Sequence, residues 1–276
     1  MKHSEFKFKT FDGLSLFGQN WQPENHPKAV ICLVHGLGEH SGRYVPIANS
    51  LTQVGYVLVS FDLRGHGKSS GPRGHTPSYE ALIQDISSLL EVSNKKFSKL
   101  PFFLYGHSLG GNLVLNYVLR RKPYLKGVIT TAPWLRLAFE PPIFKIILGK
   151  ITNYTWPSFS QKSGLDTKAL SRDPKVVYTY ENDPLVHDRI SARMFISTFQ
   201  AGQWVLEHAS EFSLPLLLML GGADKIISVK ASKEFADKIS EKCTFKIWDG
   251  LYHEIHNEPE KEEVFKFLID WLDKEI

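Results

Sequence analysis

A serine flanked by glycines is the first feature of this 276-residue sequence that could do chemistry. Residues 106–110 read Gly-His-Ser-Leu-Gly, a G-x-S-x-G pattern with Ser108 at its centre. The pattern alone is weak, but here a strand-like apolar run precedes it and a helix-like run follows. A sharp strand-to-helix turn of this kind presents a serine hydroxyl as a nucleophile. The alternative is a glycine turn that carries a structural serine.

A serine hydroxyl is a weak nucleophile and needs a neighbouring base, and the acid and base follow the serine in the order Asp or Glu, then His. Asp224 ends one apolar strand-like run, and His253 follows the next such run. Both therefore reach the sheet edge at which Ser108 stands. We expect His253 to be the general base and Asp224 to orient it. His256 is the alternative base, and Asp249 is the alternative acid.

Hydrolysis of an ester passes through an oxyanion, which backbone N–H groups bind best when they are already in place. One such group is the N–H of Leu109, directly after the nucleophile. A second is expected from the loop 35–38, which reads His-Gly-Leu-Gly after a strand-like run, and Leu37 is the candidate within it. The alternative for this loop is a simple glycine turn.

The elements that must position these residues alternate along the chain. Apolar, β-branched runs such as 29–34 and 56–61 suit strands buried on both faces of a parallel sheet. Runs with helical periodicity lie between them, for example 79–97, which Ser78 can cap. An Asp-Gly turn at 12–13 predicts an N-terminal hairpin. The alternation indicates the α/β class with a mainly parallel sheet flanked by helices.

The alternation stops near Trp134 and resumes after residue 200. Prolines, aromatics and short apolar pieces fill the stretch between. We therefore expect one core domain, made of residues 1–133 and 201–276, with residues 134–200 inserted as a cap.

Composition excludes several function classes. A formal charge of +4 and the lack of like-charge blocks argue against nucleic acid as a partner. No His or Cys pair has zinc-site spacing, the phosphate-loop and dinucleotide patterns are absent, and no cofactor is expected. Cys32 and Cys243 are expected to be small buried apolar residues. The N-terminus lacks the apolar stretch of a signal peptide, so we expect a cytoplasmic protein.

At this point several segments resemble the monoacylglycerol lipase and lysophospholipase branch of the α/β hydrolases. The string HGLGEHSGRY from His35 is far more specific than G-x-S-x-G. The other matching segments are FDLRGHGKSSGPRGH from Phe61, GHSLGGNLVLNY from Gly106, LSRDPKVVYTYENDPLVHDR from Leu170, GGADKIIS from Gly221 and YHEIHNE from Tyr252. They cover the core and reach into the expected cap.

The resemblance implies an eight-stranded sheet and a cap that covers an acyl tunnel and often meets the membrane. It also implies that the glycerol head is bound by Glu39, Arg43, His107, Tyr180 and His256. For Glu39 and Arg43 a structural ion pair is the alternative, and both descriptions can hold together.

The cap segment 143–151 is apolar on more than one helical face. A helix of that kind is either buried or faces lipid. One reading is that it packs on the core and lines the pocket. The other is transient contact with a membrane surface, where Lys145 and Lys150 could meet anionic headgroups.

Together these features predict a serine hydrolase that cleaves carboxylic esters of single-chain acyl lipids, first of all monoacylglycerols, through an acyl-enzyme on Ser108. The expected partner is a small acyl ester. A lysophospholipase or a general carboxylesterase is the alternative enzyme. A proline iminopeptidase shares the fold but needs acidic anchors for an amino terminus, for which Glu39 is thin support. The alternative from another class is a non-catalytic binding protein, which the intact Ser, Asp and His disfavour.

Overall fold

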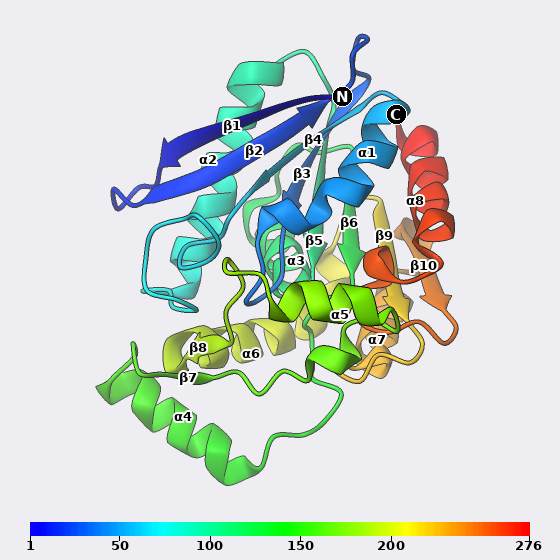
Figure 1. The fold of residues 1–276 in the computed structure, drawn as a ribbon. Helices are drawn as coiled ribbons and strands as arrows, with labels where there is room; N and C mark the ends of the chain where they lie inside the picture. The colour runs from blue at the N-terminus through cyan, green and yellow to red at the C-terminus, as the bar shows by residue number, and fades with distance from the viewer.

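A single eight-stranded sheet forms the centre of the protein (Figure 1). The computed structural model describes residues 1–276, apart from the side chain of Ser240. The strand order is β1-β2-β4-β3-β5-β6-β9-β10. β2 pairs antiparallel with both β1 and β4, and all other pairs are parallel. The strands are β1 (Lys2–Lys9), β2 (Ser15–Gln22), β3 (Ala29–Val34), β4 (Tyr56–Phe61), β5 (Phe102–His107), β6 (Gly127–Thr131), β9 (Leu216–Gly221) and β10 (Cys243–Trp248).

Helices cover both faces of this sheet. In Figure 1, α1 and α8 lie on one side, and α2 and α3 lie on the other. The mainly parallel sheet, flanked in this way, confirms the expected α/β-hydrolase fold. The helices of the core are α1 (Val45–Gln53), α2 (Tyr79–Phe97), α3 (Leu109–Arg121), α6 (Ala192–Glu207), α7 (Val229–Lys238) and α8 (Lys261–Glu275).

The strand sequences explain why two cores form. Side chains of a strand alternate between the faces of a sheet. In β3, Val30 and Cys32 join the core beneath α2 and α3, whereas Ile31 and Leu33 join the core beneath α1 and α8. Every residue of β3 and β4 is buried, as expected for parallel strands with helices on both faces.

Two local predictions are also confirmed. β1 and β2 pair antiparallel as a hairpin from Lys9 opposite Ser15, and Gly13 turns the chain with a φ of +80°. Ser78 caps α2, because its side chain accepts a hydrogen bond from the N–H of Ala81 at 3.1 Å.

The segment 134–200 lies at the end of the molecule opposite the two termini (Figure 1). It contains α4 (Ile143–Thr155), α5 (Pro174–Glu181) and a small antiparallel pair, β7 (Ser160–Lys162) and β8 (Arg189–Ser191). Its expected end at residue 200 falls inside α6, which starts at Ala192. A Cβ on Gly202 of α6 would lie 2.4 Å from the Leu135 carbonyl oxygen, so α6 packs tightly on the start of the segment.

No helix among the described residues combines the length and the apolar character that crossing a bilayer requires.

Candidate active site

Ser108 occupies the sharp turn between β5 and α3. Its φ of 52° and ψ of −114° lie in a region that side chains rarely adopt, so the surrounding structure must hold the residue there. The glycines on either side make room for the turn. A Cβ on Gly106 would lie 2.3 Å from the Gly110 carbonyl oxygen, and a Cβ on Gly110 would lie 1.9 Å from that of Val34. No larger residue fits at either position without a shift of the backbone.

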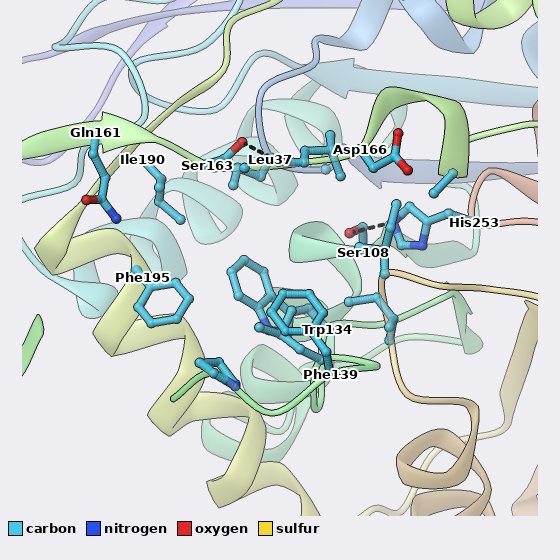
Figure 2. Close-up of a pocket in the computed structure, with 18 of the residues that line it drawn as sticks. Leu37, Ser108, Trp134, Phe139, Gln161, Ser163, Asp166, Ile190, Phe195 and His253 are labelled. Carbon is cyan, nitrogen blue, oxygen red and sulfur yellow. Dashed lines mark hydrogen bonds between the residues drawn. The ribbon is translucent and has the colours of Figure 1, made fainter. Parts of the chain in front are cut away.

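Loops after β9 and β10 bring an acid and a base to this turn. His253 Nε2 lies 3.0 Å from Ser108 Oγ, and His253 Nδ1 lies 2.7 Å from Asp224 Oδ2. Asp224 Oδ1 accepts the N–H groups of Ile226 at 2.8 Å and Ile227 at 3.0 Å, which fixes the carboxylate. The structure therefore joins Ser108, His253 and Asp224 in one hydrogen-bonded row. Figure 2 shows the part of this row that faces the cavity, from His253 to Ser108.

The same row sets the charge behaviour of His253. Burial lowers the pKa of this imidazole, but the carboxylate of Asp224, with smaller contributions from Glu254 and Glu39, raises the pKa above 6.5. A raised pKa makes His253 a stronger base toward the Ser108 hydroxyl. The rival residues lie elsewhere: Asp249 is exposed, and His256 is buried with its ring stacked on Tyr44 at 5.0 Å.

The loop 35–38 lies directly beside the nucleophile. A Cβ on Gly36 would be 3.3 Å from the Cβ of Ser108. Leu37 lines the cavity that Ser108 faces, and Leu109 is the first residue of α3. The N–H groups in the first turn of a helix have no partner within the helix, and the helix dipole favours negative charge there. This placement fits the oxyanion role expected for Leu109, and the role of the Leu37 N–H stays a prediction.

A buried ionic network braces this loop from behind. Glu39 Oε1 accepts the Gly36 N–H at 2.7 Å and the Tyr44 hydroxyl at 2.7 Å. Arg43 donates to Glu39 Oε2 at 2.8 Å and to both carboxylate oxygens of Glu254 at 2.6 and 2.7 Å. Burial would raise the pKa of Glu254, but Arg43 outweighs it and holds this pKa at about 2. The ion pair considered for Glu39 and Arg43 is present, and it includes Glu254.

The five residues expected at a glycerol head divide into two sets. Glu39, His107 and Tyr180 line the cavity. Arg43 and His256 are not among its described lining residues. The Arg43 guanidinium lies 4.7 Å from the Tyr180 ring centre, and the His256 ring lies edge-on to His107 at 4.7 Å. These two side chains therefore lie next to residues that reach the cavity.

His107 is held next to the base in an uncharged form. Its Nδ1 lies 3.0 Å from the Thr131 hydroxyl, and its ring centre lies 4.9 Å from that of His253. Burial, and then repulsion from His256 and His253, lower the pKa of His107 well below 6.5. A neutral imidazole in this position can form a hydrogen bond with a ligand without adding a second positive charge beside the base.

The cavity in front of Ser108 has a volume of about 690 Å³ and extends beneath the 134–200 segment. One wall is aromatic, with Trp134, Phe139 and Phe195 (Figure 2). The facing wall carries Gln161 of β7 together with Ser163 and Asp166, which follow it. Sequence reasoning missed all of these residues, because none of them belongs to a motif and most come from short or irregular segments. The only usable signal was the apolar face of α6, which bears Phe195.

Among the described residues, no group of three His, Cys, Asp or Glu side chains is arranged to hold a metal ion.

Comparisons with known proteins agree with this geometry. A family model described as serine aminopeptidase, S33, matches residues 25–260. A monoacylglycerol lipase from Mycolicibacterium smegmatis is 31% identical over 271 residues, which cover 98% of this chain and 96% of that protein. The crystal structure of a Paleococcus ferrophilus monoacylglycerol lipase has a TM-score of 0.85 at 35% identity, and both chains are covered completely.

A longer relative also matches. An uncharacterized abhydrolase domain-containing protein of Dictyostelium discoideum is 36% identical over 279 residues. That match covers all of this chain, which spans about 30% of the length of the Dictyostelium protein.

Proposed function

We propose that this chain, which belongs to the family described as serine aminopeptidase, S33, hydrolyses monoacylglycerols to a fatty acid and glycerol. It is a carboxylic ester hydrolase with the α/β-hydrolase fold. The observation that carries the proposal is the row Ser108–His253–Asp224, which opens onto a largely apolar cavity. An acyl chain fits such a cavity, and the row supplies an activated nucleophile at its wall.

The proposed reaction has two halves. His253 takes the proton of Ser108 as Oγ attacks the ester carbonyl, and the resulting oxyanion is bound by the N–H groups of Leu37 and Leu109. The C–O bond then breaks, and His253 gives its proton to the leaving glycerol oxygen. His253 then takes a proton from water, which attacks the acyl-enzyme. As the bond from the acyl carbon to Ser108 Oγ breaks, His253 returns this proton to Oγ and the fatty acid is released. Asp224 holds the imidazole in the productive tautomer throughout.

The substrate class follows from the two ends of the cavity. Aromatic and aliphatic side chains would surround the acyl tail, whereas Glu39, His107 and Tyr180 offer polar atoms near Ser108 for a small head with free hydroxyls. Arg43 and His256, which the family resemblance also implies, would act from behind these residues. A choline phosphate head is larger and brings charge into this narrow region, which disfavours lysophosphatidylcholine.

The acids near Ser108 disfavour an aminopeptidase. Such an enzyme needs a carboxylate that is free to bind a protonated amine. Both oxygens of Glu39 already accept hydrogen bonds from the protein, and both oxygens of Glu254 accept from Arg43. Releasing either carboxylate would break a buried ion pair, which costs roughly 3–5 kcal/mol.

We also propose that residues 134–200 act as a cap and that α4 touches lipid. Ile143, Phe144, Ile147, Leu148 and Ile151 are each more than half exposed. None of the thirteen described residues of α4 is buried. Phe144 and Leu148 also line the cavity, so the apolar surface of the helix continues from the outside into the site. Exposed apolar surface of this kind marks an interaction site, and Lys145 and Lys150 suit an anionic membrane.

A panel of esters with one acyl chain tests the substrate assignment. Monoacylglycerol, lysophosphatidylcholine and methyl ester of the same fatty acid are compared by kcat/KM. We expect monoacylglycerol to be highest, because the other two either lack the hydroxyls or carry a charged head. Faster hydrolysis of lysophosphatidylcholine would replace the proposal with a lysophospholipase.

A further inference from the structure

Two imidazoles that the proposed mechanism does not use meet where the cap touches the core. His66 lies in the glycine loop after β4, and His187 lies in the loop before β8 of the cap. Their ring centres are 4.6 Å apart, with an angle of 48° between the planes. The Nε2 atoms of both rings are buried, and neither makes a hydrogen bond of normal geometry, although the Gly65 carbonyl lies close to the His187 ring. Buried polar atoms without a partner are costly, so this pair requires an explanation.

The other nitrogen of each ring fixes its tautomer. His66 Nδ1 lies 2.9 Å from the Arg64 carbonyl, which can only accept, so Nδ1 carries the proton and Nε2 is an acceptor. His187 Nδ1 accepts the Arg189 N–H at 3.2 Å, so the proton of the neutral ring is on Nε2, which is a donor. The two unpartnered atoms are therefore complementary, one donor and one acceptor.

Both rings are held in the neutral form that this pairing requires. Burial, and then repulsion from His187 and His35, lower the pKa of His66 well below 6.5. Burial and the nearby Arg73 lower the pKa of His187 to about 4, although the Gly65 carbonyl and the Asp188 carboxylate oppose that shift. At neutral pH neither ring carries a charge that would prevent the other from approaching.

The pair is connected to the oxyanion loop at two points. The backbone N–H of His187 donates to the Gly38 carbonyl at 2.9 Å, one residue after Leu37. A Cβ on Gly38 would lie 2.5 Å from the His187 carbonyl oxygen, so the two backbones are already in close contact. On the other side, the His66 ring lies 5.4 Å from the ring of His35, which contacts the Gly36 carbonyl through Nδ1 at 2.7 Å.

We propose that His187 is a positioning residue: its Nε2–H donates to His66 Nε2 when the cap closes over bound substrate, and this link locks the oxyanion loop. Catalytic hydrogen bonds are often long before substrate binds and tighten in the complex. The link would fix the Gly38 end of the loop while Glu39 fixes its Gly36 end. The Leu37 N–H would then be held against the developing oxyanion. This inference rests on the proposed ester hydrolysis at Ser108.

The kinetic test changes the donor while the ring volume is kept. His187→Phe retains packing against His66 but has no N–H, and His187→Gln places an amide N–H near the position of Nε2. With a monoacylglycerol, we expect His187→Phe to lower kcat by about tenfold with KM within about twofold, since loop misplacement weakens only transition-state contacts. His187→Gln should recover most of kcat. His75→Phe is the matched control at the same cap–core contact, where His75 meets Ser191 at 2.9 Å, and it should leave both constants unchanged.

A second readout separates positioning from general packing. A trifluoromethyl ketone adds to Ser108 and forms an oxyanion, whereas an alkyl glycerol ether binds without reaction. His187→Phe should weaken ketone binding by about the same factor as kcat and leave ether binding unchanged. Adding His66→Phe to His187→Phe should cause no further loss if the two rings act as one link.

The outcomes separate this inference from the function on which it rests. A parent protein that hydrolyses no ester and binds no ketone would refute the proposed function and the inference together. An active parent with a His187→Phe variant of normal kcat, or one that loses ketone and ether binding equally, would refute the role of His187 alone. If adding His66→Phe to His187→Phe lowered kcat by a further full factor, the two rings would not act as one link, and this result would also refute the proposal.

Discussion

Ser108, His253 and Asp224 are buried and joined by hydrogen bonds, whereas α4, on the cap side of the same cavity, has no buried residue among its thirteen. The turn at Ser108 is held by backbone contacts that leave no space for a methyl group on Gly106 or Gly110. α4 packs mainly on α6 and presents aliphatic side chains outward. The first region is built to fix atoms in place for chemistry, and the second is built to meet a changing apolar surface.

The largest effect should come from the hydrogen-bonded row. Ser108→Ala or His253→Ala should lower kcat by about 10⁴-fold or more, because the members of such a row act as a unit. The proteins should still fold, since neither change leaves a larger side chain behind. Turnover of a soluble p-nitrophenyl ester measures the loss. Near-normal turnover by His253→Ala, with loss in His256→Ala, would transfer the role of base to His256.

Asp224→Asn should be nearly as severe, because the amide favours the wrong imidazole tautomer. It also removes the charge that keeps the pKa of His253 above 6.5. In the parent, kcat/KM should fall as the pH drops through that raised pKa, since protonated His253 cannot accept a proton. In Asp224→Asn the residual activity should persist to lower pH. An unchanged acid limb in the pH profile would show that another group titrates there.

Two glycines contrast the regions by stability. Gly110→Ala should lower the free energy of unfolding by about 3 kcal/mol, because its Cβ would meet the Val34 carbonyl oxygen at 1.9 Å. In Gly149→Ala, on α4, the new Cβ would lie 3.0 Å from the end of the Ile196 side chain, and alanine has a higher helix propensity than glycine. The free energy of unfolding of Gly149→Ala should therefore differ from that of the parent by no more than about 1 kcal/mol. Urea denaturation measures both, and equal losses would contradict the contrast.

α4 should control access to lipid without affecting the chemistry. Ile147→Ser with Leu148→Ser should weaken binding to anionic vesicles by about tenfold or more, since two exposed aliphatic side chains are lost. Turnover of a short soluble ester should change little. Vesicle co-sedimentation and an ester assay on the same samples measure the two effects. Equal vesicle binding by parent and variant would leave α4 as a wall of the cavity only.

The smallest effect should concern the polar end of the cavity. Tyr180→Phe should reduce the preference for monoacylglycerol over the matched methyl ester by a few-fold, about the value of one neutral hydrogen bond. Turnover of p-nitrophenyl esters should be nearly unchanged. Competition between the two lipid esters in one reaction measures the preference. A preference identical to that of the parent would remove Tyr180 from the head-binding set.

The two regions also differ in how far the sequence predicts them. The strand and helix patterns of the core, the hairpin at 12–13 and the Ser78 cap are local features, and each is confirmed. The spacing of Ser108, Asp224 and His253 follows from parallel strands ending at one edge. The aromatic wall brings Trp134 next to Phe195 of α6, and this depends on how the segment between them folds back, for which the sequence carries no signal.

Long-range ionic contacts were equally out of reach. Glu254 directly follows the base in the sequence, whereas its partner Arg43 lies 211 positions earlier in the chain. The backbone hydrogen bond from His187 to Gly38 likewise joins two residues that lie far apart in the sequence. Contacts of this kind depend on tertiary packing. The partner of a charged side chain is therefore set by the fold and cannot be predicted from the residues next to it in the sequence.

The central claim is that Ser108 is an activated nucleophile. Labelling of the native protein with a fluorophosphonate, followed by peptide mapping, tests it most directly, because only an activated serine reacts. The account predicts one phosphonyl adduct, on Ser108, that forms at neutral pH and is absent from His253→Ala. A parent protein that takes up no label, or takes it up on another residue, would contradict it.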